Sequence, residues 1–229
     1  MIAIIGAMPE EIQAFLKEAE IKHVHKWHST DFHIGTFKNQ AVVIVQSGIG
    51  KVLAAMTCQY LIDNFQPTKI LFTGVAGALN SNYEIGDIVI SDDLIQHDVD
   101  GEALGFSRGT VLFSDTREFK ACEKLKAIAV TAKVDAHKIY EGRILTGDQF
   151  FTKKKLNDSD YLFTELAGDA IEMEGAAIAQ VAIHNQIPFL IIRTISDKAD
   201  ENASEDFTKL LPVIAHNSFI ITSHLLENL

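Results

Sequence analysis

Short, nearly continuous apolar runs are the feature that most constrains the fold of this chain. They are rich in Ile and Val and do not alternate with polar residues, which is typical of strands covered on both faces in a parallel or mixed sheet. The runs span residues 2–5, 41–45, 70–72, 88–90 and 189–195. They predict a sheet buried between two layers of other structure.

Helical patterns lie between these runs. Ile12, Phe15, Leu16 and Ala19 form one apolar stripe at helical spacing. Further helices are predicted over residues 51–65, 118–132, 174–185 and 207–226. Alternating strands and helices predict an α/β sheet with helices on both sides. With 229 residues and no linker or internal repeat, we expect one domain over residues 1–229.

Charge and cysteine content narrow the partners and the compartment. The net charge of −11 weighs against a protein that binds nucleic acid phosphates. No apolar run is long enough to span a membrane, and the N-terminus lacks the basic flank of a signal peptide. Cys58 and Cys122 have no metal-site spacing, so we expect free thiols, no metal site and a cytoplasmic protein.

Glycine and short polar residues gather directly after the apolar runs. The segments concerned are residues 6–8, 47–50, 73–77, 146–148, 172–174 and 196–197. In open α/β sheets, ligands bind at the carboxyl ends of the strands. These segments therefore predict one crevice, which contains acids but few bases.

Two acidic positions stand at predicted helix starts. Glu11 follows Pro9 and lies on the flank of the buried stripe, where the helix dipole favours an ionised carboxylate. Glu172 and Glu174 flank Met173 at a strand-to-helix turn, which can direct one side chain to the crevice and one to the structure. Acids at helix starts are often purely structural, so spacing alone leaves both interpretations open.

Arg193 places a full charge inside an apolar run, and an isolated buried guanidinium is costly, so it needs an acid. The two-residue period of a strand puts Arg193 and Asp197 on one face, as a structural ion pair or as part of a site. The paired aromatics Phe150 and Phe151 can stack on a planar base or fill the core. For His97, next to Asp98, a structural or solvent-exposed role is favoured.

Together these motifs resemble the 5′-methylthioadenosine/S-adenosylhomocysteine nucleosidases, in family order and spacing along nearly the whole chain. The matching stretches are residues 4–11 (IIGAMPEE), 47–52 (SGIGKV), 73–77 (TGVAG), 146–150 (TGDQF), 172–176 (EMEGA) and 196–197 (SD). The resemblance implies a nucleoside phosphorylase-like fold, which is a mixed central sheet flanked by helices. It also implies a homodimer that needs no metal or other cofactor.

The same resemblance implies the reaction. Water would cleave the N-glycosidic bond of methylthioadenosine, S-adenosylhomocysteine and 5′-deoxyadenosine, releasing adenine. Asp197 matches the acid that protonates N7 of adenine, because the unprotonated base is a poor leaving group. Glu11 matches the general base for the attacking water. Glu174 matches the acid that binds the ribose hydroxyls and stabilises positive charge on the sugar.

Substrate-binding positions also carry over from the family. Phe150 resembles the ring that stacks on adenine, and the backbone of Phe151 would bind the edge of the base. Met173 resembles the apolar floor under the ribose. The other implied binding residues are Met8 and Ile49 near the sugar and the 5′ group, Gly77 beside the base, Glu172, Arg193 as the holder of the water-side acid, Ser196, and Phe207 over the 5′ substituent.

Two departures from the family pattern leave the 5′ substituent open. Many members have serine where this chain has Val75. The segment over residues 101–110, which in the family a partner subunit lends to the 5′ pocket, is altered and keeps only Phe106 as an aromatic. The alternatives are an aminodeoxyfutalosine nucleosidase, a phosphorylase, for which Glu11 would repel the anion, and a non-catalytic nucleoside-binding protein.

Overall fold

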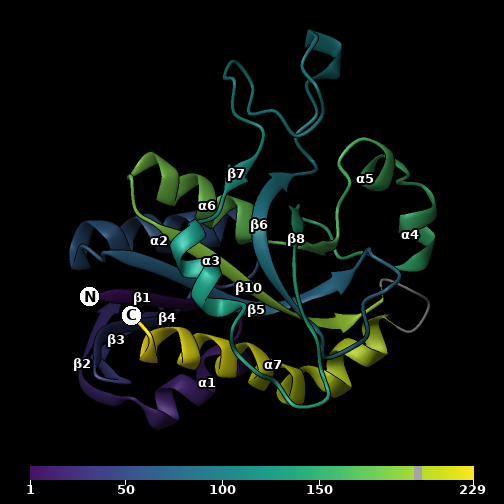
Figure 1. Ribbon diagram of the computed structural model, residues 1–229. Coiled ribbons are helices and arrows are strands. Elements are labelled where there is room, and N and C mark those ends of the chain that lie inside the picture. Colours follow the sequence, from purple (N-terminus) through teal and green to yellow (C-terminus); the bar gives the residue numbers. More distant parts are fainter. Residues whose placement is uncertain (199–202) are drawn as a thin grey trace.

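The computed structural model describes residues 1–198 and 203–229, and it describes only the backbone of Lys153 and of residues 203–214. It shows an α/β fold in which a mixed central sheet has helices on both faces (Figure 1). This is the fold class that the sequence predicts.

The strands form one continuous sheet. They are β1 (Ile2–Gly6), β2 (Glu20–Trp27), β3 (Thr30–Phe37), β4 (Gln40–Gln46), β5 (Lys69–Ala78), β6 (Ile88–Gln96), β7 (Phe119–Lys120), β8 (Ile139–Thr146), β9 (Ala170–Glu172) and β10 (Phe189–Asp197). Their order is β10-β6-β8-β9-β5-β1-β4-β3-β2, with β7 beside β6. Because β10 also pairs with β5, the strands β5, β10, β6, β8 and β9 close into a ring.

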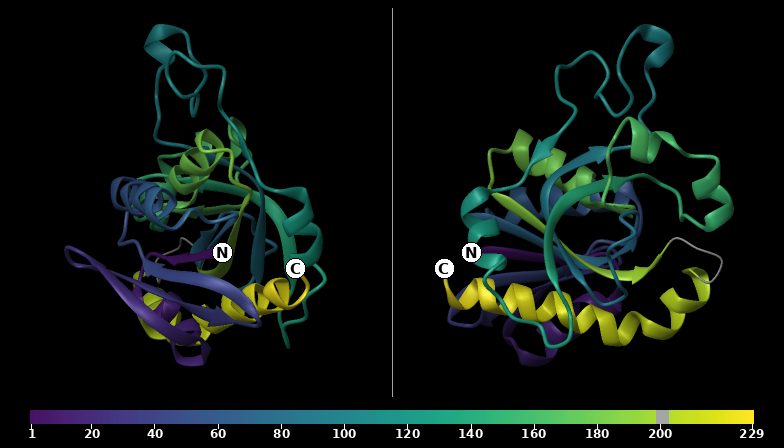
Figure 2. Two further views of the ribbon diagram at one scale, coloured as in Figure 1. Left: turned by 90° about the vertical axis from the view of Figure 1, so that its left-hand side faces the viewer. Right: turned by 45° about the vertical axis from the view of Figure 1, so that its right-hand side comes forward.

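The helices cover this sheet in two layers. They are α1 (Pro9–Glu18), α2 (Lys51–Phe65), α3 (Glu123–Ala129), α4 (Lys153–Asn157), α5 (Tyr161–Thr164), α6 (Gly175–His184) and α7 (Ala203–Glu227), with one 3-10 turn at Glu102–Leu104. Helices α1 and α7 pack together on one face, and α2 and α6 pack together on the other (Figure 2). Phe15 of α1 packs against Phe219 of α7, with their ring centroids 4.9 Å apart. No helix of the described residues is long and apolar enough to cross a membrane.

One sequence prediction about local structure is wrong in its bounds, and two strands were not predicted. The helix predicted over residues 118–132 begins only at Glu123, because Phe119 and Lys120 pair with β6 and Phe119 is buried. The sequence pattern also missed β2 and β3. Most side chains of β2 are polar and exposed or half-buried, so this strand has no apolar run to reveal it.

Strands β5 and β10 extend beyond their apolar runs, so parts of the sequence motifs that follow these runs lie within the sheet. Gly74, Val75 and Gly77 lie within β5, and Ser196 lies within β10, rather than in loops. The two strands run parallel, with Arg193 opposite Gly74. A larger side chain at position 74 would clash, because a Cβ at Gly74 would lie 2.6 Å from Oε1 of Glu11.

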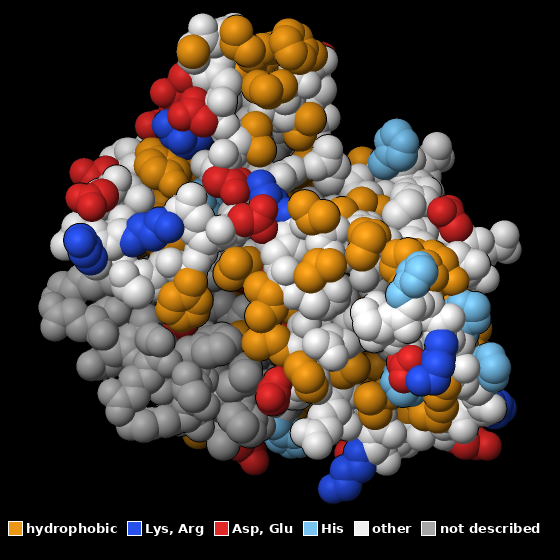
Figure 3. Space-filling view, turned by 180° about the vertical axis from the view of Figure 1, so that it is seen from behind, with side chains coloured by type: hydrophobic (Ala, Val, Ile, Leu, Met, Phe, Trp, Pro, Cys, Tyr) orange, Lys and Arg blue, Asp and Glu red, His pale blue; other side chains and the backbone are white. Residues whose placement is uncertain are grey.

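The segment between β6 and β7 projects from the body, at the top of Figure 1. It exposes three large apolar side chains, Leu104, Leu112 and Phe113, of which Phe113 is 83% exposed. Figure 3 shows hydrophobic side chains on this projection and on the face below it. Val52 and Met56 of α2 are also exposed.

Candidate active site

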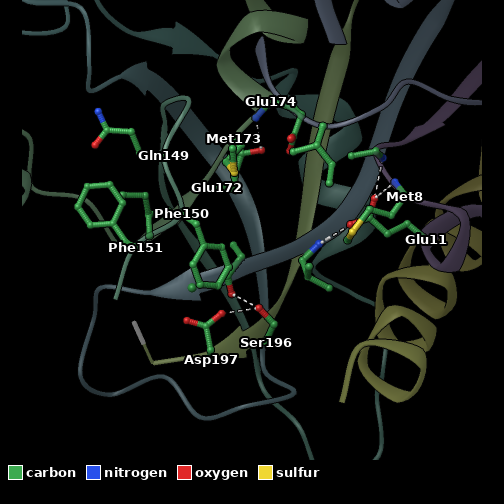
Figure 4. A pocket seen from close by; sticks show the side chains of 16 residues that line it. Met8, Glu11, Gln149, Phe150, Phe151, Glu172, Met173, Glu174, Ser196 and Asp197 are labelled. Atoms are coloured by element: carbon green, nitrogen blue, oxygen red, sulfur yellow. Dashed lines mark hydrogen bonds between the residues drawn. The ribbon is translucent and has the colours of Figure 1, made fainter. Parts of the chain in front are cut away.

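A cavity lies where segments after β1, β4, β8 and β9 meet strands β5 and β10 (Figure 4). Its lining residues are Ala7, Met8, Glu11, Ile49, Val75, Ala76, Gly77, Gln149, Phe150, Phe151, Ile171, Glu172, Met173, Glu174, Ser196 and Asp197. All three residues predicted to be catalytic are among them. A cavity therefore lies at the predicted strand ends, and the charged side chains among its described lining residues are all acidic.

Glu11 is held by three backbone N–H groups. Oε2 accepts hydrogen bonds from the N–H of Ala7 (2.6 Å) and Met8 (3.0 Å), and Oε1 accepts one from Val75 (3.2 Å). Burial raises the pKa of Glu11, although nearby Arg193 and these N–H groups lower it. Burial thus outweighs the ionising effect expected of a helix start. These hydrogen bonds fix the carboxyl group in position.

Glu172 accepts hydrogen bonds on both of its oxygens. Arg193 donates from Nη2 to Oε2 over 2.7 Å, and the Thr146 hydroxyl donates to Oε1. The backbone N–H of Gly175 donates over 2.7 Å and that of Glu174 over 3.2 Å, both to Oε2. Glu172 therefore fixes the start of α6 and, with it, the position of Glu174.

The ion pair of Arg193 corrects a sequence expectation. Arg193 pairs with Glu172 and not with Asp197, because an irregularity in the pairing of β10 with β5 between Ile195 and Asp197 interrupts the two-residue period. The guanidinium is 1% exposed and lies 4.0 Å from the ring centroid of Phe72. Arg193 is not among the lining residues, so it acts on the acids from behind the cavity wall.

Glu174 has a different environment from its neighbour. It stands immediately before α6, is 6% exposed, and its Oε1 accepts a hydrogen bond from the N–H of Gly50 over 2.7 Å. Burial, and then the charge of Glu172, raise the pKa of Glu174 to about 8. At neutral pH, Glu174 of the unliganded protein is therefore mostly protonated.

Asp197 and Phe150 lie together at the end of the cavity away from Glu11 and Glu174 (Figure 4). Ser196 Oγ is 2.8 Å from Oδ2 of Asp197 and 3.2 Å from the carbonyl oxygen of Ala76. A Cβ at Gly77 would lie 3.0 Å from Oδ1 of Asp197, so glycine leaves room for this carboxyl group. Phe150 is 43% exposed.

The rings of Phe150 and Phe151 lie in different environments. Phe150 presents its ring to the cavity (Figure 4), whereas Phe151 is 4% exposed and its ring belongs to a small hydrophobic cluster that includes Leu145 and Leu166. The sequence left stacking and core filling open for this pair. The structure gives the exposed position to Phe150 and the core position to the side chain of Phe151.

The structure brings together every predicted binding residue except two. Arg193 lies behind the wall, and the side chain of Phe207 lies outside the described residues. Sequence reasoning did not assign five lining residues to the site: Ala7, Val75, Ala76, Gln149 and Ile171. Each stands within or beside a motif that was recognised, so adjacency along the strand could have identified them.

Fold and site together define the class of protein. A family model of the Phosphorylase superfamily matches residues 1–227, and the chain belongs to this superfamily. Within it, the chain belongs to the 5′-methylthioadenosine/S-adenosylhomocysteine nucleosidase family. It is 35% identical to such a nucleosidase from Marinomonas sp. (strain MWYL1), over 99% of this chain and 98% of that one.

Solved structures agree with this placement. The nucleosidase of Neisseria meningitidis, in complex with methylthio-immucillin-A, is 32% identical and superimposes with a TM-score of 0.93, covering 100% of this chain and 99% of that one. The futalosine hydrolase of Helicobacter pylori strain 26695 is 33% identical, with a TM-score of 0.92 and coverage of 100% and 97%.

Proposed function

We propose that this protein hydrolyses the N-glycosidic bond of 5′-methylthioadenosine and S-adenosylhomocysteine, and also of 5′-deoxyadenosine, releasing adenine. One observation carries the proposal. The cavity is lined by Glu11, Glu174 and Asp197 together with the exposed ring of Phe150, and none of the lining residues that the structure describes is Lys or Arg. Such a wall suits a neutral nucleoside and an attacking water.

The cavity has two ends that suit the two halves of a nucleoside. Phe150 and Asp197 lie at one end, where a planar base can stack on the ring and meet a carboxyl group (Figure 4). Glu11, Met8 and Glu174 lie toward the other end (Figure 4). The N-glycosidic bond would then lie between the acid for the leaving group and the base for the water.

Proton transfers follow from this arrangement. Asp197 would donate a proton to N7 of adenine as the bond to C1′ lengthens, which requires a protonated carboxyl group. Glu11 would accept a proton from the water that attacks C1′. Glu174 would bind the ribose hydroxyls, and its negative charge, once it is ionised, would stabilise the developing oxocarbenium ion.

The residues that line the cavity suit hydrolysis better than phosphorolysis. A phosphorylase must hold a phosphate dianion beside C1′, for which cationic groups are needed. At the nucleophile end, Glu11 already takes three backbone N–H groups that could otherwise bind an anion. We therefore expect adenine release at the same rate with and without inorganic phosphate.

A second substrate is favoured by one observation. The likeness to a futalosine hydrolase at a TM-score of 0.92, with the altered sequence over residues 101–110, supports aminodeoxyfutalosine as an alternative substrate that also yields adenine. A competition assay that compares kcat/KM for the four nucleosides decides between them.

The proposal includes a homodimer in the cytoplasm. Ile49 lines the cavity and yet is 53% exposed, and Val52 and Met56 continue this apolar surface along α2. A second copy packed here would cover the surface and finish the wall of the site. Replacing Val52 by Glu should shift the sedimentation coefficient to that of a monomer. Two free thiols suit a reducing compartment.

The direct test is adenine release by the purified protein from each nucleoside. Asp197→Asn keeps the shape and the contact with Ser196 but cannot donate an acidic proton. We expect kcat to fall by about 10²- to 10⁴-fold, with the circular dichroism spectrum unchanged. Asp63→Asn, an exposed change on α2, is the matched control. No adenine from any of the nucleosides contradicts the function, and an active Asp197→Asn variant contradicts the role of the acid.

A further inference from the structure

His97 is a fully buried histidine next to the cavity, but it is not one of the lining residues. It directly follows β6, and its backbone N–H donates to the carbonyl of Thr146 over 2.9 Å. Its ring meets that of Phe151 edge-on, with centroids 5.4 Å apart and planes at 80°. His97 thus contacts the segment of residues 147–151, which presents Phe150 to the cavity.

Gly147, the first residue of this segment, lies directly against the imidazole. A Cβ at Gly147 would be only 2.2 Å from Nε2 of His97, so the ring fills the space that a side chain at position 147 would need. Gly147 is not among the glycines with positive φ. The requirement for glycine is therefore steric contact with His97, and the ring limits where the backbone of the segment can run.

The imidazole is fixed from its other side. Nδ1 lies 3.2 Å from the hydroxyl of Tyr161, and the guanidinium of Arg108 lies 4.4 Å from the Tyr161 ring centroid. Burial lowers the pKa of His97 to about 4, although the charge of Asp98 opposes this. The ring is therefore neutral at physiological pH. Within the described residues Nε2 has no hydrogen-bond partner, so the ring acts on the segment by packing.

Asp98 secures the same segment by hydrogen bonds. Oδ2 accepts the N–H of Asp148 over 3.0 Å, and Oδ1 accepts Nζ of Lys51 over 2.6 Å. Oδ1 of Asp148 in turn accepts the N–H of Lys51 over 2.8 Å. The segment is thereby joined to the turn before α2, where Gly50 holds Glu174. His97 and Asp98 together fix the segment relative to the nucleophile end of the site.

We propose that His97 is a positioning residue for the adenine base. Through contact with Gly147 and Phe151 it fixes the segment of residues 147–151, so that Phe150 and the adjoining backbone meet the base in a preorganised geometry. This rests on the proposed nucleosidase function, since that function brings adenine to Phe150.

The test is a double-mutant cycle on adenine affinity, measured by isothermal titration calorimetry with the full-length protein. His97→Ala and Gly147→Ala should each weaken adenine binding by about ten- to a hundredfold, the range expected for a small misplacement of binding groups. In the double variant the new methyl group occupies space left by the ring. We therefore expect it to bind adenine no more weakly than His97→Ala alone. In turnover, KM should rise by a larger factor than kcat falls.

His97→Gln keeps much of the volume against Gly147 and should recover most of the affinity. Gly147→Ala disturbs the same contact from the other side, so its loss of affinity tests the inference even where His97→Ala fails to fold. Tyr83→Phe, at a buried ring stacked on Tyr140 and not among the lining residues, is the control for general effects on the core. Wild-type affinity in His97→Ala or in Gly147→Ala, or additive losses in the cycle, would overturn the inference alone. A wild-type protein that does not bind adenine would overturn the proposed function, and this inference with it.

Discussion

Replacing Glu174 by Gln should stabilise the unliganded protein, and by more as the pH rises. Burial raises the pKa of Glu174 from 4.5 to about 8. Below pH 4.5 the group is neutral in both the folded and the unfolded chain and has no effect. Between these two values the unfolded chain ionises and the folded one does not, so this group lowers the free energy of unfolding as the pH increases. Gln is neutral at every pH, so the free energy of unfolding of the variant does not fall in this way.

The magnitude follows from the shift of the pKa. Each unit corresponds to about 1.4 kcal/mol, so the difference between Glu174→Gln and wild type should change by about 3 kcal/mol from pH 4.5 to 7 and about 5 kcal/mol by pH 9. The prediction concerns only how the difference in free energy of unfolding between the two proteins changes with pH. A contribution that is the same at every pH, such as one from an altered hydrogen bond with the N–H of Gly50, cancels. Urea denaturation at fixed protein concentration, at several pH values, measures it.

Glu10→Gln is the matched control, since Glu10 is exposed and lies in the same fold next to a site residue. Its difference from wild type should stay within about 0.5 kcal/mol at each pH. A Glu174→Gln profile parallel to that of wild type would refute the reasoning, because it would mean that the folded protein accommodates a charge at this position as easily as the unfolded chain does.

Three further predictions concern groups around the acids and the core. Arg193→Leu leaves Glu172 without its cation in a buried position and should lower the free energy of unfolding by about 3–5 kcal/mol; urea denaturation checks this, and adding Glu172→Gln should restore part of the loss. Gly74→Ala places a methyl group against Glu11 and should reduce kcat/KM about ten- to a hundredfold with an unchanged circular dichroism spectrum. Phe15→Ala empties the contact between α1 and α7 and should cost about 3–5 kcal/mol, seen as a lower Tm by calorimetry.

The sequence predicted the buried strands well because their signal is local. The apolar runs of β1, β4 and β10 mark positions covered on both faces, so composition alone locates them. Strand β2 has no such signal, since most of its side chains are polar and at least partly exposed. It exists because β3 pairs with it, and pairing is a property of two segments at once.

The site shows the same division between local and non-local information. Glu11 and Glu174 could be placed near a crevice from their positions at helix starts. The partner of Arg193 could not be predicted, because the irregularity before Asp197 changes which side chains share a face. The position of His97 could not be predicted either. His97 follows β6 and Gly147 follows β8, and only the pairing of these two strands brings the residues into contact. Strand periodicity and helix capping relate residues that are close in sequence. These contacts depend instead on how strands far apart in sequence pair with one another.

The closed ring of strands has a consequence for how copies of this protein can associate. Because β5, β10, β6, β8 and β9 pair around the ring, the order of the described strands ends at β2, which offers a long free edge. That edge carries Lys22 and Lys26 and is irregular between Ile21 and His23. Charges and irregular pairing disfavour the addition of another strand. Sheet-to-sheet growth between molecules is thereby discouraged, and the homodimer proposed above would use the apolar face of α2 instead of this edge.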